Sequence, residues 1–215
     1  MRYVFLSDVH GHLRRLEAAL AYIASLHPDR IIFLGDICGD ECFRRLFDAG
    51  AVGVFGNWEV SGWSKLAEPL QRAVLQLPAF LGEDDFIAAH SSPFPLMGMG
   101  GPAQVQAQIR QRNIHWRVLF PYLTDESIRW QVWAELLARG RRLLFHGHTH
   151  QQVSWSLDAG GRERLLRGSI LHASPGMHYL IGVGSICRPD DGPGITFVSY
   201  DADAGMVQWH RLPEP

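Results

Sequence analysis

The fold of this chain is indicated first by the stretch RYVFLSDVHGH, residues 2–12. Its first five residues are mostly apolar or aromatic and are followed directly by polar ones, so the stretch predicts a buried strand over Arg2–Leu6 and a loop after it. Apolar residues then recur at helical spacing over Leu13–Ile23, and Pro28 ends the pattern. A strand, a polar loop and a helix in succession are typical of an α/β fold.

The same alternation continues along the chain. Further predicted strands cover 30–34, 51–55, 79–81, 86–89 and 142–145, and further predicted helices cover 43–46, 61–74 and 124–140. Residues 93–102 are rich in Pro, Gly and Met and predict either a lid over a site or a plain connector. The remainder, 152–212, alternates short β-like runs with turn residues and predicts a second, mostly antiparallel sheet. No repeat or linker divides the chain, so we expect one domain over residues 1–215.

Composition limits the classes of partner and compartment. The formal net charge is −2 and no cluster of Lys and Arg stands out, which argues against a surface for long nucleic acid and leaves room for a small anionic substrate. The three cysteines are an odd number, and the chain has no secretory signal pattern and no apolar run that could span a bilayer. We therefore expect a cytoplasmic protein without membrane contact.

Polar residues with metal-binding side chains follow the predicted strands directly. They are Asp8, His10, Asp36, Asn57, His90, His148 and His150. Loops at the carboxyl ends of strands are where α/β sheets bind ligands, so these residues should converge. In Asp8-x-His10 and His148-x-His150, an extended backbone would direct both side chains to one face. Carboxylate, imidazole and amide ligands together suit Mn, Fe, Zn or Ni better than Ca or Cu(I).

The pattern resembles the calcineurin-like metallophosphoesterase superfamily, and in particular its small bacterial and archaeal phosphodiesterase-type branch. The resemblance rests on Asp8-x-His10, Gly35-Asp36, Gly56-Asn57-x-Glu59, His90 and Gly147-His148-x-His150, in that order and at the approximate spacing of the family. Residues 184–192 resemble a weaker tail motif of the same branch. Each motif alone is weak, but their joint order is specific. The fold that the resemblance implies is a two-sheet β-sandwich flanked by helices, with layers α/β/β/α.

The resemblance also implies a dinuclear metal site. Asp8, His10 and His150 would hold one ion, Asn57, His90 and His148 the other, and Asp36 would bridge the two. The cofactors implied are two divalent transition metal ions, with Mn preferred and Fe, Zn or Ni as alternatives. Asp36, Asn57 and His148 would be catalytic, and a metal-bridging hydroxide would hydrolyse phosphodiester or nucleotide phosphoanhydride bonds. Glu59 is expected to support the site or to start a helix.

One position departs from the family pattern. The family often has His after the motif Asn, where it is assigned as a proton donor or phosphate contact, and this chain has Trp58. Indole donates no catalytic proton at neutral pH, so substrates with good leaving groups should be preferred. Trp58 and Trp63 could stack a nucleobase or form an apolar pocket wall. Spare histidines could replace the missing acid or contact substrate; they are His12, His115, His172 and His178.

Two other functions are considered against the sequence: a protein phosphatase and a non-catalytic scaffold. A serine/threonine-type protein phosphatase would more often show Gly-Asp-x-x-Asp-Arg-Gly and Gly-Asn-His-Glu, and here the stretches are GDICGD at 35–40 and GNWE at 56–59. A non-catalytic scaffold would usually show eroded ligands, and none of the candidate ligands is eroded. The partner predicted is therefore a small phosphorylated substrate, with a nucleotide as one option. Nothing in the sequence indicates an oligomeric state.

Overall fold

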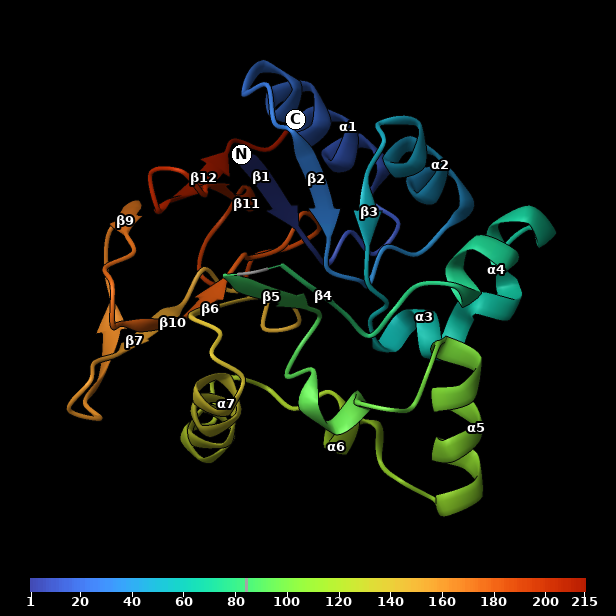
Figure 1. Ribbon diagram of the computed structural model, residues 1–215. Coiled ribbons are helices and arrows are strands. Elements are labelled where there is room, and N and C mark those ends of the chain that lie inside the picture. Colours follow the sequence, from blue (N-terminus) through green and yellow to red (C-terminus); the bar gives the residue numbers. More distant parts are fainter. Residues whose placement is uncertain (84) are drawn as a thin grey trace.

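The computed structural model describes residues 1–83 and 85–215 and consists of two mixed β-sheets packed face to face between layers of helices (Figure 1). The strands are β1 Arg2–Leu6, β2 Arg30–Phe33, β3 Val52–Gly53, β4 Phe80–Gly82, β5 Phe86–Ala89, β6 Leu143–His146, β7 Ser154–Leu157, β8 Glu163–Leu166, β9 Ile170–His172, β10 His178–Gly182, β11 Ile195–Asp201 and β12 Met206–Leu212. The helices are α1 Leu13–Ser25, α2 Asp40–Asp48, α3 Asn57–Gly62, α4 Glu68–Leu75, α5 Pro102–Arg112, α6 Trp116–Leu119 and α7 Glu126–Ala138, with short 3-10 turns η1 Trp63–Lys65 and η2 Phe94–Leu96. The implied α/β/β/α sandwich is thus confirmed.

Side chains of β1 alternate between two apolar layers. Tyr3 and Phe5 pack toward the second sheet, whereas Val4 and Leu6 pack toward the helices. Between the sheets, the ring of Phe5 stacks on that of Phe145 with centroids 3.9 Å apart. Burial on both faces explains why the predicted strand is almost continuously apolar.

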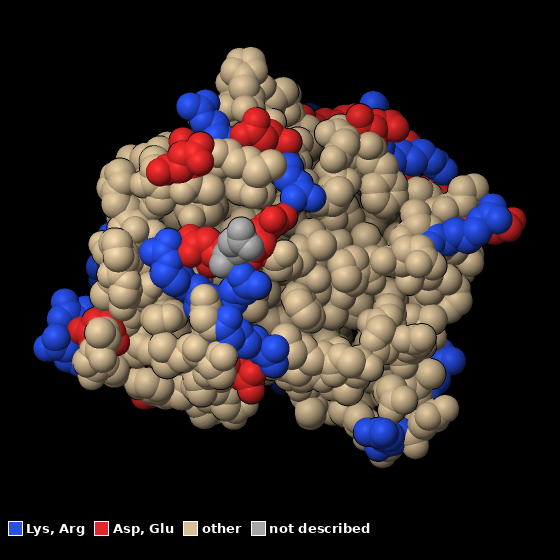
Figure 2. Space-filling view, in the orientation of Figure 1, with Lys and Arg blue, Asp and Glu red and all other residues tan. Residues whose placement is uncertain are grey.

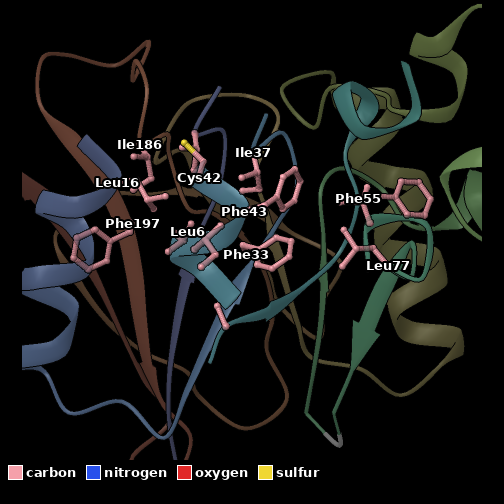
Figure 3. Close-up of a cluster of buried hydrophobic side chains, with 14 of the residues drawn as sticks. Leu6, Leu16, Phe33, Ile37, Cys42, Phe43, Phe55, Leu77, Ile186 and Phe197 are labelled. Atoms are coloured by element: carbon pink, nitrogen blue, oxygen red, sulfur yellow. The ribbon is translucent and has the colours of Figure 1, made fainter. Parts of the chain in front are cut away.

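The outer layer of the first sheet is closed by α1 and α2. Leu16 of α1 and Phe43 of α2 are fully buried in one cluster with Phe33 of β2 and Phe197 of β11 (Figure 3). The apolar stripes that predicted the two helices are the faces that enter this cluster. A comparable layer covers the second sheet, where Trp133 of α7 packs with residues of β5, β6, β7 and β10.

The late chain does not form a sheet of its own, so that expectation is wrong. The sheets have the orders β3-β2-β1-β11-β12-β9 and β4-β5-β6-β10-β7-β8. β11 extends the first sheet by antiparallel pairing with β1, and β10 extends the second by parallel pairing with β6. Each half of the α/β part would otherwise expose an open strand edge, and the late strands pair with both edges.

Some predicted helices and strands are also corrected. The helix expected over 61–74 is divided into α3, η1 and α4, and Pro69 lies in the first turn of α4, where proline is tolerated. The strand expected over 51–55 is reduced to β3. The sequence pattern does not predict α5 and α6; α5 is glutamine- and arginine-rich and presents few apolar positions.

Within the described ranges, no helix combines the length and apolarity required to cross a bilayer.

Candidate metal centre

The loops after β1, β2 and β6 do not continue the extended backbone, so the expectation of an extended Asp-x-His and His-x-His is wrong. Asp8, His10, Asp36, His148 and His150 all have left-handed backbones, with φ of 55°, 47°, 55°, 63° and 55°. This conformation is unfavourable for residues with a Cβ and persists only where the surroundings enforce it. Backbone bonds enforce it here: Asp8 donates to the Gly35 carbonyl at 3.1 Å and His10 to the Asp36 carbonyl at 2.9 Å.

A first group of ligand atoms joins the loops after β1 and β6. Nε2 of His10 and Nε2 of His150 are 3.2 Å apart, and Oδ1 of Asp8 lies 3.7 Å and 3.3 Å from them. The other Asp8 oxygen, Oδ2, accepts the backbone N–H of His148 at 2.9 Å. Asp8 therefore presents one oxygen to the group while its second oxygen ties the two sheets together.

A second group lies beside the first. Nε2 of His90 is 3.0 Å from Oδ1 of Asn57, 3.1 Å from Nδ1 of His148 and 3.4 Å from Oδ2 of Asp36. These residues come from the start of α3 and from the loops after β5, β6 and β2. Four separate segments thus supply one set of nitrogen and oxygen atoms.

Asp36 stands between the two groups. Its Oδ2 is 3.4 Å from Nε2 of His90 in the second group and 3.9 Å from Nε2 of His10 in the first. Its Oδ1 accepts the backbone N–H of Trp58 at 2.9 Å, which fixes the carboxylate plane. One oxygen of Asp36 consequently faces both groups.

Backbone carbonyls set the tautomers of two histidines. Nδ1 of His90 is 2.7 Å from the Leu34 carbonyl, and Nδ1 of His150 is 3.0 Å from the Arg188 carbonyl. A carbonyl only accepts, so each Nδ1 donates its proton, and in the neutral ring Nε2 has the lone pair directed into its group. Arg188 belongs to the tail motif of residues 184–192, whose backbone therefore supports the site.

Glu59 supports the loop that carries Asp36. It is buried at the start of α3, and its carboxylate accepts the backbone N–H groups of Asp36 at 2.8 Å, Ile37 at 2.9 Å and Gly56 at 2.7 Å. Its side chain is not in either group of ligand atoms. The expected role as a supporting residue is confirmed.

Two glycines permit the close approach of these loops. A Cβ at Gly56 would overlap Oδ1 of Asp36, and a Cβ at Gly147 would overlap Oγ of Ser7. Neither glycine has a φ in the left-handed region, so space rather than backbone freedom explains them. The Gly-Asn and Gly-His pairs of the sequence are thus requirements of packing around the ligands.

The carboxylates and histidines are strongly coupled. Burial opposes the charged form of Asp8, but the adjacent imidazoles of His10 and His150 hold the pKa of Asp8 well below its usual range. Burial likewise opposes protonation of His90, yet the charge of Asp36 outweighs it and raises the pKa of His90 to about 9. In His150, the adjacent carboxylate of Asp8 outweighs burial and raises the pKa to about 9. Burial and the neighbouring His90 lower the pKa of His148 to about 3.

The residues present fit metal ions. Two ligands at about 2.0–2.2 Å from one ion are about 2.8–3.6 Å apart at tetrahedral or octahedral angles, and most distances within the two groups fall in that range. Oδ1 of Asp8 is buried and has no hydrogen-bond donor among residues 1–83 and 85–215. A buried carboxylate oxygen without a donor is costly unless a cation satisfies it. The neutral imidazole nitrogens and the Asn57 amide oxygen complete a ligand set for a divalent transition metal.

The expected substrate residues do not all lie at the centre. Trp58 is 53% exposed, and its ring meets that of His10 edge-on at 5.3 Å. Trp63 lines a cavity of about 420 Å³ together with Trp58. His178 begins β10, whose other end pairs with the His146 end of β6, so it lies at the end of the sheet remote from His148. His178 is therefore not supported as a substrate contact; His172, on the edge strand β9, is no better placed.

The sequence interpretation missed an aromatic wall over the second group. The ring of Tyr122 stacks on His148 with centroids 4.2 Å apart, and Trp116 meets His148 edge-on at 5.8 Å. His115, one of the spare histidines, stacks on Trp116 at 5.7 Å, and His12 is exposed at the start of α1. The stretches HWR at 115–117 and PY at 121–122 are a weak signal, because aromatic residues in a loop are equally common as packing residues.

Comparison with known proteins identifies the family and the fold. Residues 1–205 match a family model described as the calcineurin-like phosphoesterase superfamily domain. The chain is 25% identical over 201 residues to an uncharacterized protein of Methanocaldococcus jannaschii, covering 87% of this chain and 76% of that protein. Its fold is similar to that of a metallophosphoesterase from Sphaerobacter thermophilus, with a TM-score of 0.74 and 24% identity. The match covers 100% of this chain and 90% of that one. The fold is also similar to that of a novel archaeal phosphodiesterase, with a TM-score of 0.56 and 17% identity, and the match covers 99% of this chain and 100% of that one.

Proposed function

The chain belongs to the calcineurin-like phosphoesterase superfamily, and on that premise we propose that it is a dinuclear-metal phosphoesterase that hydrolyses phosphodiester or nucleotide phosphoanhydride bonds. The observation that carries the proposal is the position of Asp36. A single oxygen of its carboxylate lies 3.4 Å from a ligand nitrogen of one group and 3.9 Å from a ligand nitrogen of the other. Two separate mononuclear sites would not require a shared carboxylate.

The ligand candidates are divided between two metal ions. Asp8, His10 and His150 hold one ion, Asn57, His90 and His148 hold the second, and Asp36 is shared between them. The ions when bound supply charge neutralisation of the phosphoryl oxygens and make hydroxide available as a nucleophile at neutral pH. The chain itself contributes positioning: hydrogen-bonded loops hold the ligand atoms before substrate arrives, so little reorganisation is needed. Mn is the proposed metal, with Fe, Zn and Ni as alternatives.

The substrate class follows from what surrounds the ligands. The side chain after Asn57 is an indole, which cannot protonate a departing alkoxide, so the bond broken should have a good leaving group. Activated phosphodiesters and nucleotide anhydrides meet that condition better than alkyl monoesters. The face of the molecule shown in Figure 2 has Lys and Arg interspersed with Asp and Glu, consistent with a small substrate rather than a long nucleic acid.

Metal analysis together with a turnover screen tests the proposal. The purified protein, loaded with Mn²⁺ and freed of excess, should contain about two ions per chain. It should hydrolyse bis-p-nitrophenyl phosphate or a dinucleoside polyphosphate, and a chelator should abolish turnover until Mn²⁺ is restored. Less than one ion per chain and no turnover on either substrate would instead favour a non-catalytic scaffold and would overturn the proposal.

A further inference from the structure

A cavity of about 420 Å³ is lined in part by Trp58, whose ring contacts that of the ligand candidate His10. We call it the tryptophan pocket; its walls include Trp58, Trp63, Phe43, Cys38 and Lys65. Its volume lies within the usual range for small-molecule sites, about 300–1,000 Å³. None of the roles assigned to the metal ligands accounts for this pocket.

Trp58 links the tryptophan pocket to the metal centre. Trp58 forms part of its wall and also meets the ring of His10 edge-on at 5.3 Å. The backbone N–H of Trp58 donates to Oδ1 of Asp36 at 2.9 Å, so the position of the indole is tied to the shared ligand. A substrate with a phosphoryl group at the metal centre would therefore have its next group within reach of this pocket.

One aromatic residue of the pocket wall, Trp58, is accessible to a ligand. Trp58 is 53% exposed, which is unusual for the largest apolar side chain beside a buried centre. Trp63, by contrast, is half-buried and packs against the apolar cluster that contains Phe43. The exposed indole of Trp58 is therefore the surface on which a flat substrate group would stack.

The charge at the pocket also favours an electron-rich or anionic occupant. Lys65 is exposed, and no carboxylate in the described chain forms an ion pair with it. Two acids also line the pocket, and both have donors of their own. Asp40 accepts the backbone N–H of Ala67 at 3.1 Å and pairs with Arg44 at 3.4 Å, and Glu59 accepts three backbone N–H groups. Lys65 therefore remains the cation available to an occupant of the pocket.

We propose that the tryptophan pocket binds the nucleobase of a nucleotide substrate whose phosphate lies at the metal centre. The inference rests on the proposed phosphoesterase function. The base stacks on an indole of the pocket, a mode that accepts any base because every base has a π face. Its carbonyl or ring-nitrogen acceptors face the ammonium group of Lys65. Specificity for nucleotides over simple phosphate esters therefore arises from α3 and η1 rather than from the metal ligands.

A binding comparison separates the base from the phosphate. Adenosine 5′-monophosphate and ribose 5-phosphate share the sugar and the phosphate, and only the nucleotide carries a base. Isothermal titration of the Mn²⁺-loaded protein should give at least about 10-fold tighter binding of the nucleotide. That factor corresponds to about 1.4 kcal/mol. Quenching of tryptophan fluorescence by adenosine 5′-monophosphate, and not by ribose 5-phosphate, gives a second readout.

Substitutions in the tryptophan pocket test whether the base binds there. Trp58→Ala should remove most of the preference for the nucleotide, and Trp58→Phe should retain part of it. Lys65→Gln, at an exposed position that tolerates substitution, should weaken nucleotide binding by about threefold and leave ribose 5-phosphate unchanged. Trp130→Ala is the matched control, because Trp130 is 42% exposed on α7 and belongs to neither site. This control should leave the affinities for both ligands unchanged.

The two proposals fail in different ways. Equal affinity of the wild-type protein for both ligands, with turnover of bis-p-nitrophenyl phosphate intact, would overturn the nucleobase pocket and leave the phosphoesterase proposal standing. A preference that survives both Trp58→Ala and Lys65→Gln would also overturn it, because the base would then bind elsewhere. Absence of metal binding and of turnover would overturn the phosphoesterase proposal, and the nucleobase inference with it.

Discussion

The buried carboxylate of Glu59 accepts the backbone N–H of Asp36 at 2.8 Å, so an acid at the start of α3 holds the loop that carries the central metal-ligand candidate. Both oxygens are used, because Gly56 and Ile37 also donate to them. Asp36 has a left-handed backbone, and these bonds help to enforce it. Glu59 is therefore a positioning residue that acts through the backbone.

Glu59→Gln should destabilise the protein and weaken metal binding together. The amide group presents N–H where a backbone N–H now donates, which leaves at least one buried donor unsatisfied at about 1–3 kcal/mol. Urea unfolding of the metal-free protein and metal content after dialysis measure the two effects. Glu68→Gln, at an exposed position that pairs with Arg72, should change neither. Full metal content in a stable Glu59→Gln variant would show that the loop holds its shape without the carboxylate.

Asp36→Asn should reduce the metal content from about two ions to one or fewer and lower kcat by at least about 100-fold. The amide keeps an oxygen that can accept the Trp58 N–H, but it removes the charge shared between the two groups. Metal analysis and steady-state kinetics with Mn²⁺ check this. Asp48→Asn, an exposed acid at the end of α2, is the control. Two tightly bound ions and full activity in Asp36→Asn would exclude a shared carboxylate.

Metal binding should release protons at pH 7. Burial opposes protonation of His90 and His150, but Asp36 and Asp8 raise the pKa of each to about 9 in the metal-free protein. Both are then protonated at pH 7, and a protonated ring nitrogen cannot bind an ion, so affinity should rise as pH increases from 6.5 toward 9. The stability of the metal-free protein has the opposite pH dependence. The contribution of these charged histidines to the free energy of unfolding is complete below about pH 6.5 and is lost as the pH rises through 9.

Titration calorimetry in two buffers of different ionisation enthalpy measures the protons released. We expect release at pH 7 that diminishes as the pH approaches and passes 9. A metal affinity that does not change between pH 7 and 9, with no proton release at pH 7, would contradict the raised pKa values.

Trp58 should restrict the leaving groups that are accepted. Because indole supplies no proton, p-nitrophenyl phosphoesters should react at least about 100-fold faster than the corresponding alkyl esters. Trp58→His should narrow that ratio by raising the rate on alkyl esters. Rates on the two ester types are compared at saturating Mn²⁺, with Trp130→Ala as control. Equal wild-type rates on the two ester types would mean that another group protonates the leaving oxygen.

Much of the site could be predicted from residue order alone. Asp8, His10, Asp36, Asn57, His90, His148 and His150 were identified because each follows a strand, and the carboxyl ends of neighbouring parallel strands meet at one edge. The two-sheet sandwich followed from the family resemblance of the same motifs. These are local signals, since a strand and the polar loop after it occupy adjacent residues.

The rest depended on contacts between residues distant in sequence. Periodicity could not tell which sheet β9 to β12 would join, because pairing with β1 or β6 is decided by which open edge is available. Nor could it predict that His178 lies at the wrong end of β10, or that Tyr122 stacks on His148. The left-handed backbones at Asp8, Asp36 and His148 are likewise imposed by surrounding hydrogen bonds rather than by residue type. The sequence by itself determined which side chains are available for metal chemistry, and only the tertiary structure decided their separations and the aromatic walls beside them, because packing between distant segments sets both.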